Sequence, residues 1–97
     1  MLGLCRRAGR LTSGDQAVRK ELARDKVKLL VLAEDASKRT NLAFNEIAQS
    51  RRIPVIICCS REVLGQILGK PPRSVVAILD EQFARGMLRA SGRGEFN

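Results

Sequence analysis

Three short apolar runs, separated by segments with helical spacing, restrict the fold more than any other feature of the sequence. The runs occupy residues 28–33, 53–58 and 75–79. A continuous apolar run of this length is typical of a strand that is buried on both faces of a sheet. Strands that alternate with helices along a chain predict an α/β protein. We therefore expect a three-layer α/β/α sandwich around a mixed sheet of about four strands.

The fourth strand is expected near the start of the chain. Residues 1–8 have the pattern of a short helix, and residues 11–12 that of a short strand. Ser13 is followed three residues later by Gln16, which is the spacing of a capping box. This pattern predicts a helix that begins after Ser13 and runs to about Arg24.

Residues that favour helix N-termini precede each of the later helical segments. Asp35 or Ser37 is expected to cap the next helix, Ser60 the one after it and Asp80 the last. Gly69 is expected to end the helix that Ser60 starts, because glycine suits the left-handed conformation common at helix C-termini. Helical spacing assigns the following residues to buried faces: Val18, Leu22, Leu42, Ala43, Ile47, Ala48, Val63, Leu64, Ile67, Leu68, Phe83, Met87 and Leu88.

The length and the cysteine content limit the possible functions. We expect one domain over residues 1–90 and a flexible tail over residues 91–97. The chain has no His and no Cys-x-x-Cys pattern, so we expect no metal site, no cofactor and no nucleophilic catalysis. Cys58 and Cys59 are neighbours on an expected strand and should point to opposite faces. Reduced thiols and the lack of a long apolar segment predict a cytoplasmic protein with no membrane association.

The net charge of +8, from 18 basic and 10 acidic residues, indicates a protein that binds a polyanion. The excess is uneven, because residues 1–28 hold eight basic and three acidic side chains, a net charge of +5. The chain has three Phe but neither Tyr nor Trp, which disfavours the reading of single strands by base stacking. The alternative is a protein that is basic without binding nucleic acid.

The start of the helix after Ser13 is the most informative candidate site. Gly14 is expected at the first helical position, where glycine allows a close approach to the backbone and free amides attract phosphate. Gln16, Lys20 and Arg24 recur every four residues and therefore share one polar face. Gln and Lys side chains can read base edges. The alternative is that Gln16 only completes the cap and that the two cations are only solvated helix charges.

Several segments, in their order and spacing, resemble the kink-turn RNA-binding superfamily of large-subunit ribosomal proteins, most closely its small bacterial YlxQ-like members. The resemblance covers residues 2–90. It implies a non-catalytic RNA-binding protein that docks a helix N-terminus on structured RNA, as a monomer and with the ribosome as a possible partner. The segments that carry it are Leu2 to Leu11 followed by Ser13-Gly14, Leu30 to Ser37, Ile53 to Val55, Ser60 to Gly65 and Val76 to Ile78.

In that superfamily the motif Gly-x-Asn-Glu-x-x-Lys reads the guanines of tandem sheared G·A pairs beside a three-nucleotide bulge. By position, the motif falls on Gly14, Gln16, Ala17 and Lys20. Ala17 stands at the glutamate position and cannot accept a hydrogen bond from a guanine, a loss of roughly 1–3 kcal/mol or about ten- to a hundredfold in affinity. The family's second contact is an apolar loop before the final strand. Here that loop, residues 69–74, is basic and rich in proline, which suits phosphate better than stacking.

The sequence thus predicts an RNA-binding surface with no small-molecule substrate. One alternative is a protein-interaction module with only generic RNA affinity. Another alternative is a phosphoacceptor at Asp35. We rank it last, because that chemistry needs a lysine beside the acidic residues at the strand ends, and none follows the other strands. The residues expected to contact RNA are Arg6, Arg7, Arg10, Gly14, Gln16, Lys20, Arg24, Glu34, Asp35, Ala36, Ser37, Lys70 and Arg73.

Overall fold

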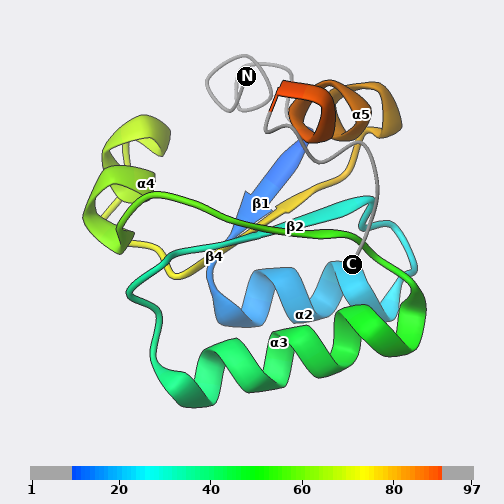
Figure 1. The fold of residues 1–97 in the computed structure, drawn as a ribbon, viewed down its shortest axis with the longest axis horizontal. Coiled ribbons are helices and arrows are strands. Elements are labelled where there is room, and N and C mark those ends of the chain that lie inside the picture. Colours follow the sequence, from blue (N-terminus) through cyan, green and yellow to red (C-terminus); the bar gives the residue numbers. More distant parts are fainter. Residues whose placement is uncertain (1–9, 91–97) are drawn as a thin grey trace.

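The computed structural model describes residues 10–90, which form four strands and four helices (Figure 1). The helix expected over residues 1–8 and the tail expected over residues 91–97 lie outside the described residues. Along the chain, the elements are β1 (Leu11–Ser13), α2 (Asp15–Ala23), β2 (Leu29–Leu32), α3 (Lys38–Arg51), β3 (Val55–Ile57), α4 (Arg61–Leu68), β4 (Val75–Ile78) and α5 (Glu81–Ala90).

The strands form one mixed sheet in the order β1-β4-β2-β3. β4 lies between β1 and β2 and is antiparallel to both, whereas β2 and β3 are parallel. The first strand of the described chain therefore pairs with the last. The α/β class and the four-stranded mixed sheet predicted from the sequence are confirmed.

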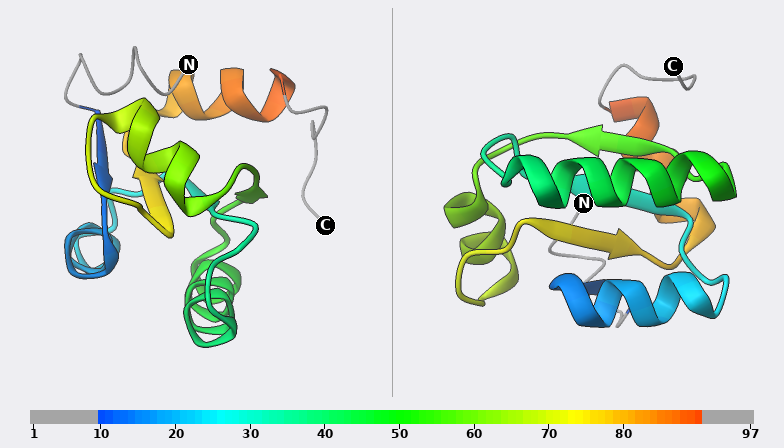
Figure 2. Two further views of the ribbon diagram at one scale, coloured as in Figure 1. Left: turned by 90° about the vertical axis from the view of Figure 1, so that its left-hand side faces the viewer. Right: turned by 90° about the horizontal axis from the view of Figure 1, so that it is seen from below.

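Side chains of the central strands alternate between two apolar cores. Leu29 and Val31 pack with residues of α4 and α5, whereas Leu30 and Leu32 pack with residues of α2 and α3. Figures 1 and 2 show the same division, with α2 and α3 on one side of the sheet and α4 and α5 on the other.

Most of the expected helix ends are confirmed. Ser37, Ser60 and Asp80 each accept a hydrogen bond from a first-turn amide of the helix that follows, at 3.1, 3.1 and 2.9 Å. Gly69 ends α4 in the left-handed conformation, with φ 68°. These contacts begin or end α3, α4 and α5 within a few residues of the helix.

The capping box expected at the start of α2 is wrong. Ser13 is the last residue of β1, and Gly14 is the N-cap, so Gly14 is not the first helical residue. The Gly14 amide donates to Val75 O at 3.1 Å, which continues the pairing of β1 with β4 past Ser13. Ser13 is thereby held in the sheet, and no side chain caps α2.

Some of the expected buried faces are wider than the real ones. Leu42, Val63 and Ile67 are 62%, 40% and 38% exposed, because α3 and α4 each turn a narrower stripe towards the sheet than the spacing predicts. Phe44 is fully buried and fills the core under α3. Ile57 is 44% exposed because β3 is an edge strand.

The two neighbouring cysteines follow β3 and do not lie on it. Cys59 has a left-handed φ of 62°, which breaks the alternation of side chains. Both side chains are half-buried and pack against the same core as α4 and α5. The prediction that they point to opposite faces is therefore wrong.

Candidate nucleic-acid interface

Four chain segments meet at one end of the strands, a surface that we call the Gly14 edge. The segments are residues 13–17, 33–39, 58–61 and 70–75. They meet there because β1, β2 and β3 end at this edge and β4 begins at it. Backbone hydrogen bonds join the segments. The Gly14 amide donates to Val75 O, the Ala33 amide to Ser74 O at 2.9 Å, and the Glu34 amide to Cys59 O at 2.8 Å. The edge is thus one connected backbone surface.

The N-terminus of α2 opens at this edge without a side-chain cap. The first hydrogen bond within the helix runs from the Val18 amide to Gly14 O at 3.0 Å, so the amides of Asp15, Gln16 and Ala17 precede it. Among the four described helices, α2 alone lacks a capping side chain. Uncapped first-turn amides and the positive end of the helix dipole favour an anion.

Gly14 combines an unusual backbone conformation with open space. Its φ of 92° and ψ of 152° lie in a region that is essentially restricted to glycine. No heavy atom of the described chain lies within 4 Å of the position that a Cβ would take. The glycine is therefore required by its dihedral angles, and the space beside it is accessible to another molecule.

Arg73 connects the last loop to the Gly14 edge. Its Nε donates to Ser13 Oγ at 3.3 Å, and its amide donates to Arg61 O at 3.1 Å. Gly65 holds the same loop from behind, because a Cβ there would lie 2.5 Å from Pro71 O. The half-buried Arg73 guanidinium is thus fixed beside the start of α2, whereas Lys70 is exposed where the loop begins.

The structure separates the remaining predicted cations. Gln16 in the first turn of α2 and Lys20 in its last turn are both exposed. Arg24 follows the far end of the helix and pairs with Glu21 at 3.5 Å. Arg10 precedes β1 at the opposite end of the sheet, where it forms an ion pair with Asp80. Arg10 and Arg24 are therefore not brought together with Gly14, and residues 6 and 7 (both Arg) lie outside the described residues.

The segment from Glu34 to Ser37 lies on the Gly14 edge, but two of its side chains have structural partners. Asp35 Oδ1 accepts the Arg61 amide at 2.7 Å, so Asp35 caps α4 and not α3. Ser37 caps α3. Glu34 is exposed, and Ala36 packs partly against the core. The segment contributes shape and backbone to the edge more than it contributes free side chains.

The prediction from sequence missed three cations of the Gly14 edge. Lys38 and Arg39 begin α3, and Arg61 begins α4 at 3.8 Å from Asp35. All three are exposed. The signal that could have found them is topological, because each helix begins just after the carboxyl end of a strand that reaches this edge.

The Cys58 thiol at this edge is poorly suited to nucleophilic chemistry. Burial raises the pKa of the Cys58 thiol to about 11, assisted by a hydrogen bond that the protonated thiol donates to Cys59 and by the charges of Cys59 and Glu34. The thiol is therefore protonated at neutral pH, and the thiolate is the reactive form. Within residues 10–90, no three His, Cys, Asp or Glu side chains are grouped so that they could hold a metal ion.

An α/β/α sandwich with an open, glycine-capped helix N-terminus at one sheet edge defines the structural class of this protein. Residues 1–87 match the model of the ribosomal protein L7Ae/L30e/S12e/Gadd45 family. The chain belongs to this family, which confirms the resemblance found in the sequence. None of the helices in residues 10–90 is long and apolar enough to cross a membrane.

Two curated proteins and one solved structure are similar over nearly the whole chain. The RNA-binding protein YlxQ of Bacillus subtilis (strain 168) is 38% identical over 88 residues, which are 91% of this chain and 88% of that protein. The RNA-binding protein YlxQ of Enterococcus faecium is 31% identical over 85 residues, 88% of this chain and 82% of that protein. The structure of a protein with unknown function from Bacillus halodurans C matches with a TM-score of 0.86 and 33% identity, over 97% of this chain and 93% of that one.

Proposed function

We propose that this protein is a non-catalytic, ribosomal-type RNA-binding protein that docks the Gly14 edge on structured, kink-turn-like RNA. The observation that carries the proposal is the uncapped N-terminus of α2 beside the open space at Gly14. Membership of a ribosomal-protein family and similarity to two proteins named for RNA binding support it.

In this proposal the backbone makes the closest contact with RNA. A phosphate or a base edge approaches the amides of Asp15, Gln16 and Ala17 through the space that a Cβ at Gly14 would restrict. Gln16 and Lys20 then reach base edges, because an amide and an ammonium group can both donate to guanine acceptors. Phosphates on either side meet the cations that begin α3 and α4 and those of the last loop.

Selectivity for a kink-turn is the part of the proposal that depends on Ala17. The Ala17 side chain has no acceptor for the guanine amino group, so recognition rests on Gln16, Lys20 and the shape of the edge. We expect a kink-turn RNA to be preferred, but less strongly than by a family member that carries glutamate at this position.

The test is a binding titration of the full chain against a kink-turn RNA at several fixed salt concentrations. The control RNA has its tandem G·A pairs replaced by Watson–Crick pairs. Tighter binding of the kink-turn at every salt concentration would support the proposal. Equal affinity for both RNAs would remove the kink-turn from it and leave only generic RNA binding.

A pair of lysine variants tests whether the Gly14 edge is the surface used. Lys20 lies on α2, four residues after Gln16 on the same polar face, whereas Lys26 lies beyond the end of the helix, and both are exposed. Lys20→Ala should weaken RNA binding about tenfold, as expected for the loss of a base contact of 1–3 kcal/mol. Lys26→Ala removes the same charge and should change affinity less than about threefold. Equal effects of the two variants would contradict docking through this edge.

A further inference from the structure

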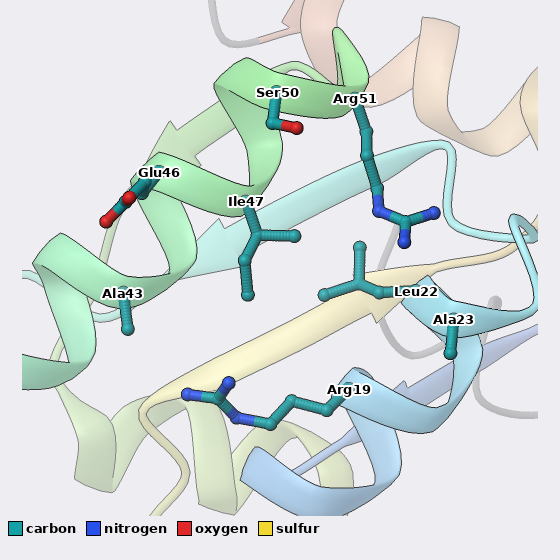
Figure 3. A pocket seen from close by; sticks show the side chains of 8 residues that line it. All are labelled: Arg19, Leu22, Ala23, Ala43, Glu46, Ile47, Ser50 and Arg51. Carbon is teal, nitrogen blue, oxygen red and sulfur yellow. The ribbon is translucent and has the colours of Figure 1, made fainter.

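A groove of about 560 Å³ lies between α2 and α3, on the face of the sheet that these helices cover (Figure 3). α2 packs on β1 and β4, and the buried side chains of α2 and α3 meet in the core beneath the groove. Leu22 and Ile47 lie in the middle of the groove, and Ala43 and Ala23 line its two opposite ends with short side chains. Leu22 is only 3% exposed, so the aliphatic surface that the groove offers comes from Ile47, Ala43 and Ala23.

Two arginines flank the apolar floor from opposite walls. The Arg19 guanidinium lies 4.9 Å from the centroid of the Phe44 ring, which holds it at the mouth of the groove. Arg51 extends from α3 towards Leu22 on the other side. Glu46 is the one carboxylate among the lining residues. The lining thus combines an apolar floor with a net positive rim.

The present partners of both arginines can be replaced. Arg19 Nε donates to Asp15 at 2.6 Å, and an Arg51 nitrogen lies 3.7 Å from Asp25. The side chains of Asp15 and Asp25 are 55% and 88% exposed, and ion pairs in such positions contribute little to stability. A carboxylate supplied by a partner could therefore take over either guanidinium at little cost.

The groove and the Gly14 edge involve different parts of α2. Arg19, Leu22 and Ala23 line the groove from the second half of the helix, and the Arg51–Asp25 pair joins the ends of α2 and α3. The amides proposed to meet RNA are at the beginning of α2. A molecule in the groove would thus leave the start of the helix open.

We propose that this groove binds an acidic amphipathic helix of another protein. Apolar side chains at i, i+3, i+4 and i+7 would lie along Ala43, Ile47 and Ala23, and flanking carboxylates would pair with the two arginines. RNA is a poorer occupant, because the floor is aliphatic and offers no ring on which a base could stack. A second copy of this chain is disfavoured by its own net charge of +8.

The probe is a displayed library of 16-residue peptides with leucine fixed at helical spacing and every other position varied. After selection on the full chain without RNA, we expect the retained peptides to be enriched in Asp and Glu beside the leucines. These peptides should bind the Ala23→Glu variant about tenfold more weakly than the parent. The new side chain narrows the groove, and its negative charge repels the acidic side chains of the peptide. Selection of basic or charge-neutral peptides, or of none, would overturn the proposal.

Ala90→Glu is the matched control, because Ala90 is also the exposed last residue of a helix and the change in net charge is identical. A selected peptide should bind Ala90→Glu within about twofold of the parent. Equal weakening by both variants, or a dimer of the parent that Ala23→Glu dissociates, would contradict an acidic partner helix. Since no RNA is present, these outcomes do not depend on whether the Gly14 edge binds RNA.

Discussion

Gly14 carries a conformational requirement that no other residue type meets without strain. Replacing it with Ala should lower the free energy of unfolding by about 1–3 kcal/mol, because φ of 92° with ψ of 152° disfavours any Cβ. Gly69→Ala is the control, since φ of 68° with ψ of 35° is the milder left-handed region and should cost about 1 kcal/mol. Urea denaturation measures both. A smaller loss at Gly14 than at Gly69 would contradict this interpretation.

Ala17 is the residue at which a gain of binding can be expected. Ala17→Glu places an acceptor in the first turn of α2, where a negative side chain is also favoured by the helix dipole. Binding to a kink-turn RNA should tighten by about tenfold or more, whereas the RNA with Watson–Crick pairs should bind no more tightly. An equal change for the two RNAs would mean that position 17 does not face a guanine.

The sequence identified Gly14, Gln16 and Lys20 as neighbours but not the way in which they are presented. Spacing alone sets which residues share a helical face, and this part of the prediction needs no tertiary information. The position of the N-cap depends on the bond from the Gly14 amide to Val75 O. That partner is distant in the sequence, so local capping rules pointed to Ser13.

At the scale of single elements, α5 depends on a charged cap. A hydrogen bond from the Phe83 amide lowers the pKa of Asp80 below its ordinary value of 3.8, and the Arg10 side chain lowers it further. The folded state therefore favours ionised Asp80, and this contribution to stability is present above pH 3.8 and is lost as the pH falls through the lowered pKa. Asp80→Asn should be less stable than the parent at neutral pH, and urea denaturation should show the difference shrinking in acid. A difference in the free energy of unfolding that does not change with pH would contradict the role of the ionised Asp80 carboxylate.

Helix α4 is fitted closely to the loop that follows it. Gly→Ala in a helix normally stabilises a protein by up to about 1 kcal/mol. At Gly65 the new Cβ would lie 2.5 Å from Pro71 O and 2.8 Å from Lys70 O, so we expect a loss of about 1–3 kcal/mol instead. RNA affinity should fall with it, because the displaced loop carries Arg73. A gain in thermal stability for Gly65→Ala would contradict the close packing.

Elements were predicted more reliably than the surfaces they bury. The apolar runs at 28–33 and 75–79 became β2 and β4, since a strand buried on both faces needs no pattern beyond hydrophobicity. The run at 53–58 gave a shorter strand at the sheet edge, and Ile57 is exposed there. Strand order is set by pairing between distant segments, which hydrophobic periodicity does not report.

At the scale of the whole molecule, the position of a charge matters more than the net charge. Lys38 begins α3 at the Gly14 edge, whereas Lys28 precedes β2 at the opposite end, and both are exposed. Lys38→Ala should reduce the salt dependence of RNA binding by about one phosphate contact, and Lys28→Ala should leave the slope unchanged. Binding measured across a salt series gives both slopes. An equal reduction of the slope in both variants would indicate that RNA is attracted by the overall charge and not by the Gly14 edge.

The pairing of β1 with β4 also sets the order in which the molecule can be assembled on a translating ribosome. Among the described strands, β1 pairs with β4 alone, and β4 is the last of the four along the chain. Until residues 75–78 leave the exit tunnel, β1 lacks a partner and the Gly14 amide lacks its acceptor. A nascent chain that ends before β4 can pair β2 with β3 but cannot form the start of α2 as it stands here. The edge proposed to meet RNA is thus completed only after β4 has been made and has paired with β1.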